Sequence, residues 1–129
     1  MVWRRIASAY VVTDPKSPGG SRPSKEALKD SGDGDPMSVY CARFVERLGL
    51  DESALLADKG RGWAVAQLQV GYLRQDEEQR VEHDPVLPSV HPYDAAHTLV
   101  IGEKDKVRRE RLAQHYGLRL SHDAPIARS

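Results

Sequence analysis

The chain has 129 residues, with 19 lysines and arginines against 19 aspartates and glutamates, so its formal net charge is zero. A protein that works mainly by electrostatic capture of nucleic acid carries surplus cations, and nucleic-acid binding is therefore not favoured. The single cysteine, Cys41, excludes an internal disulfide and favours a reducing cytoplasm. No apolar stretch approaches the roughly 18 residues that a membrane helix needs, so we expect no membrane association.

The first predicted element is a strand over residues 3–13, which is rich in β-branched and aromatic side chains and ends at Asp14-Pro15. Residues 14–35 are dense in Pro, Gly, Ser and Asp and predict a long loop. Within this loop, one turn of helix is expected at residues 24–29, where Ser24 could serve as the cap.

The strongest helical pattern covers residues 36–48. Asp35 is a good N-cap, Pro36 suits the first helical position, and Gly49 can end the helix. Apolar side chains at offsets 0, 3, 4, 7, 8 and 11 would form one helical face: Met37, Tyr40, Cys41, Phe44, Val45 and Leu48. Asp51 could cap a second, shorter helix that follows.

Alternating polarity predicts further strands. Apolar side chains alternate over residues 63–75, which indicates a half-buried strand, although a helix through the same residues would group Val65, Leu68 and Tyr72 and stays open. Residues 80–84 would pair with this strand in a hairpin. The apolar run at residues 96–102 is typical of a central strand that is buried on both faces.

The last predicted helix covers residues 106–116, capped by Asp105, with Val107, Leu112 and Tyr116 towards the core. A polar tail over residues 121–129 is expected to fray. These elements predict a single α+β domain over residues 1–120. Its small mixed or antiparallel sheet of about four strands would pack against two main helices.

A histidine cluster is the first candidate site. His83, His91 and His97 lie within fifteen residues and are interleaved with Asp84 and Asp94. Imidazole and carboxylate are ligands of zinc and other divalent metals, so these five residues could hold a metal ion, as in a metal-dependent nuclease. Their spacing matches neither a helical ligand pair nor a zinc knuckle, and a surface loop remains the alternative. His97, at the start of an apolar strand, could also act as a general base.

Opposite charges gather in two segments. Residues 104–119 hold six cations against two anions, and residues 74–84 hold five acids against two arginines. The two segments could pair within or between chains, and such patches steer association. The predicted interaction residues lie on the last helix: Lys106, Arg108, Arg109 and Arg111. A solvated helix face is the alternative interpretation.

A third candidate site rests on the order of four features. They are an early arginine on a strand (Arg4 or Arg5), the stretch Gly19-Gly20-Ser21-Arg22, the segment Met37-Ser38-Val39-Tyr40, and Glu46. This order resembles RES-type toxins, which have an ADP-ribosyltransferase-like fold and consume NAD. The resemblance implies that Arg4 or Arg5 and Arg22 hold the NAD phosphates, that Tyr40 stacks on nicotinamide, and that Glu46 stabilises the ribosyl cation. Where that family has Trp-Asn after the arginine, this chain has Pro23-Ser24.

A looser resemblance covers more of the chain. The segments RPS, DPMSVY, HDP and AHTLVIGEK are similar to small proteins of high-GC bacteria that are suspected of roles in defence or toxin systems. The chain has no Walker loop, no GxGxxG and no GxSxG motif. We therefore expect a non-enzymatic interaction module of a bacterial system, with a protein partner or a second copy as ligand. An NAD-consuming enzyme is the main alternative, and a metal-dependent nuclease is the weaker one.

Overall fold

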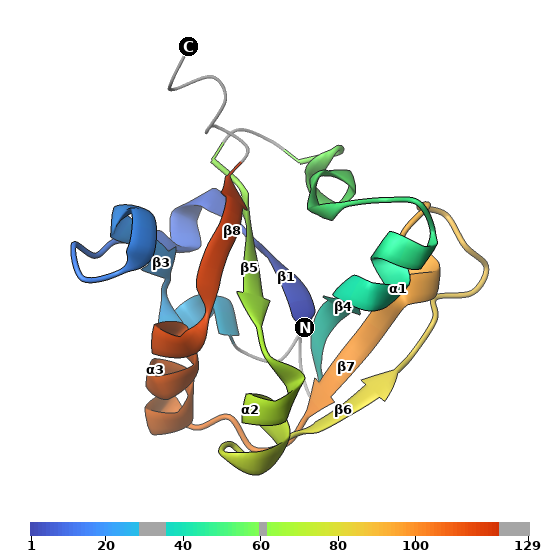
Figure 1. Ribbon diagram of the computed structural model, residues 1–129. Helices are drawn as coiled ribbons and strands as arrows, with labels where there is room; N and C mark the ends of the chain where they lie inside the picture. The colour runs from blue at the N-terminus through green and yellow to red at the C-terminus, as the bar shows by residue number, and fades with distance from the viewer. Residues whose placement is uncertain (29–35, 60–61, 122–129) are drawn as a thin grey trace.

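The computed structural model describes residues 1–28, 36–59 and 62–121. Its centre is an antiparallel sheet of six strands in the order β6-β7-β4-β1-β5-β8 (Figure 1). In chain order the strands are β1 (Val2–Ile6), β4 (Met37–Cys41), β5 (Ala64–Leu68), β6 (Arg80–His83), β7 (His97–Ile101) and β8 (Gly117–Ser121). A separate hairpin pairs β2 (Val11–Thr13) with β3 (Ser21–Pro23). The predicted α+β class is confirmed, with more strands than expected.

Three α-helices and several short 3₁₀ helices complete the fold. The α-helices are α1 (Ala42–Arg47), α2 (Val70–Gln75) and α3 (Lys106–His115). The 3₁₀ helices are η1 (Ser8–Tyr10), η2 (Pro18–Gly20), η3 (Lys25–Leu28), η4 (Glu52–Leu56) and η5 (Asp94–Ala96). No helix in the described part of the chain combines the length and apolar character that spanning a bilayer requires.

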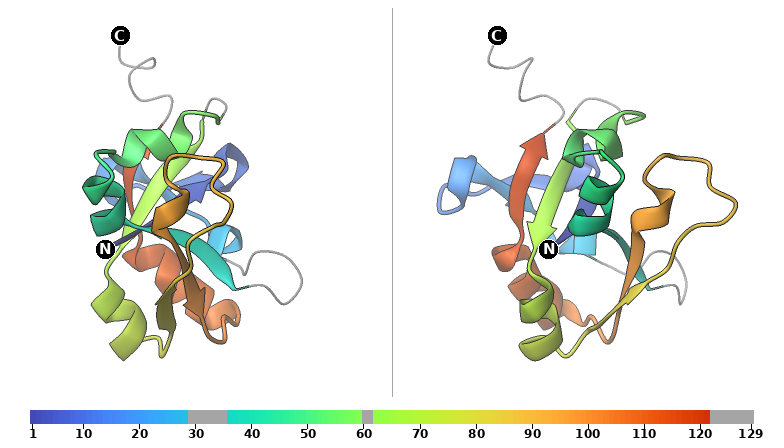
Figure 2. Two further views of the ribbon diagram at one scale, coloured as in Figure 1. Left: turned by 90° about the vertical axis from the view of Figure 1, so that its right-hand side faces the viewer. Right: turned by 45° about the vertical axis from the view of Figure 1, so that its right-hand side comes forward.

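Both faces of the sheet are covered, by different elements. Side chains alternate along a strand, so Val2 and Trp3 point to opposite faces. On the first face, the strand residues pack with α3 and η3; its buried members include Val2, Ile6, Met37, Val39, Val100, Leu28 and Leu112. On the second face, Trp3, Tyr40 and Val65 pack with α1, η4 and η5. Figure 2 shows α1 and η4 on the opposite side of the molecule from the β2–β3 hairpin.

The prediction of one helix over residues 36–48 is wrong for its first half. Residues Met37–Cys41 form β4, and only Ala42–Arg47 are helical. β4 pairs with β1 on one side and β7 on the other. Its β-branched and aromatic residues suit that position, and pairing on both sides outweighs the helical spacing of the apolar residues. The predicted cap, Asp35, lies outside the described residues.

Three predicted strands change in extent or partner. The strand over residues 3–13 is divided by η1 into β1 and β2. Residues 63–75 form β5 followed by α2, so the helical alternative is confirmed only for the second half. The predicted pairing of β6 with β5 is wrong. β6 lies at the edge of the sheet and pairs with β7. β7 is fully buried on one face only, at Thr98 and Val100.

Two predicted caps are confirmed. The Asp105 side chain accepts a hydrogen bond from the Arg108 backbone N–H (2.8 Å) and starts α3. The Asp51 side chain accepts from the Ser53 N–H (3.0 Å) and starts η4. Val107 is 58% exposed, so its predicted core position is wrong, whereas Leu112 and Tyr116 are buried. Residues 29–35 of the predicted loop and 122–129 of the predicted tail lie outside the described residues.

Candidate functional site

Arg5 and two tyrosines form a polar cluster on the second face. Arg5 extends from β1 and donates from Nη2 to Tyr40 Oη (3.0 Å) and from Nη1 to Tyr93 Oη (2.9 Å). Its guanidinium carbon lies 5.3 Å from the centre of each ring. Burial raises the pKa of Tyr40 and of Tyr93, so both hydroxyl groups keep their protons at neutral pH.

Arg5 has no acidic partner at contact distance. Among the described residues, no carboxylate oxygen lies within 4.0 Å of its guanidinium nitrogens. Asp94, which is close enough to influence Tyr40 and Tyr93, accepts instead from the backbone N–H groups of Val90 and His91 at 2.8 and 2.9 Å. Burial would raise the pKa of Asp94, but these backbone donors hold it below its ordinary value. The Asp94 carboxylate is thus held by hydrogen bonds within its own loop.

Beside Tyr40, the His97 ring contacts the Ser38 side chain through one nitrogen and Asp84 through the other. His97 Nε2 lies 3.1 Å from Ser38 Oγ. His97 Nδ1 lies 2.8 Å from the Asp84 carbonyl oxygen and 3.3 Å from its carboxylate Oδ2. The His97 ring also meets the Tyr40 ring edge-on, with centroids 5.7 Å apart. The sheet sets this arrangement, because Ser38 and Tyr40 share a face of β4 while Tyr40 pairs with His97 on β7.

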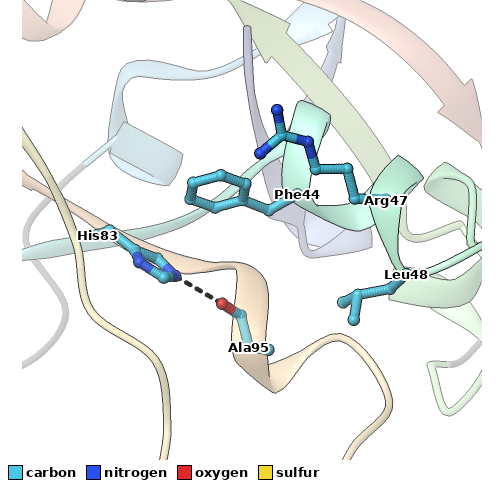
Figure 3. A pocket seen from close by; sticks show the side chains of 5 residues that line it. All are labelled: Phe44, Arg47, Leu48, His83 and Ala95. Atoms are coloured by element: carbon cyan, nitrogen blue, oxygen red, sulfur yellow. Dashed lines mark hydrogen bonds between the residues drawn. The ribbon is translucent and has the colours of Figure 1, made fainter.

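An apolar pocket opens between α1, β6 and η5 (Figure 3). Its volume is about 230 Å³, and it is lined by Phe44, Arg47, Leu48, His83 and Ala95. The His83 ring packs on Phe44 with centroids 4.6 Å apart, and His83 Nε2 contacts the Ala95 carbonyl oxygen at 2.6 Å. These two contacts fix the pocket walls.

The loop of residues 84–93 begins and ends beside this pocket and exposes apolar side chains. Val86 is 37% exposed, Leu87 81% and Val90 79%. The loop is nevertheless held by hydrogen bonds: Val86 N–H donates to the Asp94 carbonyl oxygen (3.1 Å), and the Asp94 carboxylate anchors Val90 as described above. The Leu87 and Val90 side chains therefore extend to solvent from a loop whose backbone is held in place by hydrogen bonds.

No protein-family model matches this chain, and no curated protein or solved structure matches it either.

The structure separates the residues that the resemblance to RES-type toxins brings together. Arg5 and Tyr40 are in contact. Arg4 points to the first face, where it donates to the carbonyl oxygens of Ala27 (2.7 Å) and Ser38 (2.5 Å). Arg22, on β3, forms an ion pair with Asp14 (2.9 Å). Glu46 lies on the exposed side of α1, whereas Tyr40 is buried.

The five predicted metal ligands do not converge. His91 stacks on the Tyr93 ring, with centroids 5.1 Å apart, and His83 faces Phe44. The Asp94 carboxylate binds the backbone N–H groups of Val90 and His91, and of the five side chains only those of His97 and Asp84 lie within 4.0 Å of each other as an ion pair among the described residues. Over residues 1–28, 36–59 and 62–121, no group of three or more His, Cys, Asp or Glu side chains is placed to hold a metal ion. The prediction of a metal site is thus not supported by this geometry.

The basic and acidic segments pair within the chain. Arg111 binds the Glu77 carboxylate through Nε (2.9 Å) and Nη2 (2.8 Å). Arg108 donates to the Glu77 carbonyl oxygen (2.9 Å), and Arg109 lies 3.7 Å from Glu26. Of the four predicted interaction residues, these three arginines therefore have partners inside the protein. The fourth, Lys106, is exposed.

Sequence reasoning missed Ser38, Tyr93 and the exposed loop as functional candidates. The alternation of Met37, Ser38, Val39 and Tyr40 would have placed Ser38 and Tyr40 on one face of a strand, had a strand been expected there. Tyr93 is distant from β1 in the chain, and no local pattern indicates that it meets Arg5.

Proposed function

We propose that this protein is an interaction module that binds a second copy of itself through loop 84–93 and the adjacent apolar pocket. The observation that carries the proposal is an ordered loop with two almost fully exposed apolar side chains, Leu87 and Val90. Clustered exposed apolar side chains mark interaction sites on folded proteins. Because hydrogen bonds to Asp94 already hold the loop, little conformational entropy would be lost on binding.

A second copy suits this surface because the exposed Leu87 side chain and the apolar pocket lie on the same side of one molecule. In a dimer with two-fold symmetry, each contact occurs twice, so Leu87 of each copy would enter the pocket between Phe44 and Leu48 of the other. The charges around the surface are complementary as well. Arg47 borders the pocket, and Glu82 and Asp84 at the base of the loop have side chains that are 52% and 54% exposed.

The proposal includes a cellular setting that rests on sequence alone. The resemblance to small bacterial proteins of defence systems supports an accessory role in such a system. The single cysteine supports the cytoplasm as its location.

Sedimentation equilibrium of the full chain over a wide range of concentration tests the proposal. We expect a reversible monomer–dimer equilibrium that the double substitution Leu87→Ser and Val90→Ser shifts strongly to monomer. Val107→Ser is the matched control, because Val107 is also an exposed apolar residue (58%) but lies on α3. A wild-type protein that stays monomeric at the highest concentration would overturn self-association, as would an equal effect of the control.

A second candidate function is NAD consumption, which the contact between Arg5 and Tyr40 favours. An arginine can hold a phosphate with paired donors, and the neighbouring ring offers a stacking surface. The test is release of nicotinamide from NAD by the wild-type protein. We expect this activity to be lost in Glu46→Gln and kept in Glu110→Gln, which exchanges an exposed glutamate on α3. Absence of nicotinamide and of ADP-ribosylated products in the wild-type reaction would remove this candidate.

A further inference from the structure

The protonation of His97 follows from its neighbours. Its Nδ1 faces two oxygens of Asp84, the carbonyl at 2.8 Å and the carboxylate at 3.3 Å, and neither of them can donate a hydrogen bond. The neutral ring therefore carries its proton on Nδ1, and Nε2 holds a free electron pair. Ser38 Oγ, at 3.1 Å, is then the donor to Nε2. A hydroxyl that donates to an oriented imidazole is in the position of a serine nucleophile beside its general base.

The positions of these groups are fixed by the sheet. Ser38 lies on β4, between β1 and β7, and His97 begins β7. The Asp84 backbone N–H donates to the His97 carbonyl oxygen (2.8 Å), which ties the orienting residue to the strand that holds the base. Ser38 is only partly buried, and so are Leu99, its partner on β7, and Ile101. This half of the second face is thus less buried than the half around Trp3 and Val65.

Donors for a developing negative charge lie on the same face. Tyr40 and Tyr93 each accept a hydrogen bond from Arg5, so their own hydroxyl protons point away from it. Within the described residues, neither of these protons has an acceptor. Arg5 itself has nitrogens whose remaining protons are not directed at a carboxylate. One cation and two hydroxyl donors on this face thus have no carboxylate acceptor among the described residues.

We propose that Ser38 is a nucleophile, with His97 as its general base, in the hydrolysis of small carboxylic esters that carry a negative charge. Ser38 Oγ attacks the ester carbonyl carbon while His97 Nε2 takes the hydroxyl proton. The bond from that carbon to the alcohol oxygen breaks, and His97 returns the proton to the departing alcohol. Water, deprotonated by His97, then attacks the acyl-serine, which releases the acid and restores the Ser38 hydroxyl. Arg5 binds the negative charge of the substrate.

An alkyl fluorophosphonate tests the nucleophile on the full chain without knowledge of the substrate. Ser38 Oγ would form a bond to phosphorus, fluoride would leave, and the proton would pass to His97. We expect one adduct, assigned to Ser38 by peptide mass spectrometry and absent in Ser38→Ala. General-base catalysis contributes at least about 100-fold, so His97→Gln should slow the labelling by that factor or more. Gln can still hydrogen-bond to Ser38 but cannot take its proton at neutral pH.

Controls separate chemistry from folding. Ser89→Ala removes an exposed hydroxyl that, within the part of the chain that the structure describes, binds only the His91 carbonyl oxygen, and this variant should label at the wild-type rate. Melting curves of His97→Gln and wild type establish that the fold is kept. The proposal is overturned if wild-type Ser38 is not labelled, if exposed serines label as fast as Ser38, or if folded His97→Gln labels at the wild-type rate.

A pair of esters tests the substrate class. The wild-type protein should cleave para-nitrophenyl hydrogen succinate, which is anionic, with a higher kcat/KM than neutral para-nitrophenyl acetate. Arg5→Met should lower that preference by about tenfold, as expected for loss of a charge-assisted hydrogen bond. Equal preference in wild type and Arg5→Met would exclude Arg5 as the binding group. These assays do not depend on dimerisation, so they remain decisive if the protein proves to be a monomer.

Discussion

Arg111 and Arg5 are both held by hydrogen bonds, but their partners differ in charge. Arg111, on α3, binds Glu77 through two nitrogens, and the Glu77 side chain is 1% exposed. Arg5, on β1, meets only the hydroxyl groups of Tyr40 and Tyr93 among the described residues. The first arginine is paired with a carboxylate inside the protein, whereas the second has no carboxylate within 4.0 Å among the described residues.

The contrast separates a structural site from a candidate functional one. Glu77 receives hydrogen bonds from Arg111 and from the Tyr72 hydroxyl, and the Arg111 bond is the main reason that its pKa lies below the ordinary value. Arg111 Nε, Arg111 Nη2 and the Tyr72 hydroxyl all donate to the Glu77 carboxylate. Around Arg5, two hydroxyl protons and part of the guanidinium have no acceptor within the described chain. A ligand with negative charge would complete the second site but has no place in the first.

The largest expected effect is the loss of the Glu77 carboxylate. Glu77→Gln removes the ion pair and weakens the bond from Tyr72, so we expect the free energy of unfolding to fall by about 2 kcal/mol. The loss is below that of a fully buried pair because Arg111 is 47% exposed and can turn to water. Urea denaturation measures the change.

Glu78→Gln is the matched control for that experiment. Glu78 is the next residue in the chain, its side chain is 79% exposed, and its nearest cation, Arg108, is 3.8 Å away. Exposed pairs contribute little, so this variant should unfold close to the wild-type midpoint. Equal losses for the two variants would show that Glu77 is not the structural partner of Arg111.

Acid should remove the same interaction, to a smaller extent. Because folding lowers the pKa of Glu77, its contribution is fully present above the unfolded value of about 4.3 and is lost as the pH falls through the folded value. Asp14, Asp51 and Asp94 also have lowered pKa values, so the wild type loses stability from several groups. The difference between wild type and Glu77→Gln isolates one of them. We expect this difference to shrink from pH 7 to about pH 3 in urea denaturation; a constant difference would contradict the assignment.

The sequence correctly predicted the helix starts that depend only on neighbouring residues. The caps at Asp51 and Asp105 need only the next three residues, and both helices begin where expected. β4 is the opposite case. The same apolar residues fit a helix or a strand, and the choice is made by β1 and β7, which are distant in the chain. After Pro36, residues 37–48 contain no proline or glycine, so no helix breaker marks the boundary between β4 and α1.

The sequence pointed to single residues of the candidate site but not to the contacts between them. Arg5, Tyr40 and His97 stood out for their chemistry, and the structure places all three on the second face. Their partners Ser38 and Tyr93 depend on strand order, which puts β4 between β1 and β7, and on the return of the chain through loop 84–93. For the charged segments 74–84 and 104–119, the sequence left pairing within the chain and pairing between chains both open. In the structure Arg111 and Glu77 of these segments pair within the chain.

Arg5→Met should change stability less than the loss of the Glu77 carboxylate does, and it separates the two arginines most directly. The substitution removes two hydrogen bonds to hydroxyl groups and a cation–ring contact, but it also removes a half-buried charge without an acidic partner. These changes oppose each other, so we expect the free energy of unfolding to change by less than about 1 kcal/mol. A loss as large as that of Glu77→Gln would mean that Arg5 is a structural residue. Succinate supplies the complementary measurement: a ligand that binds the folded state raises the melting temperature, so it should stabilise wild type and Glu78→Gln but not Arg5→Met.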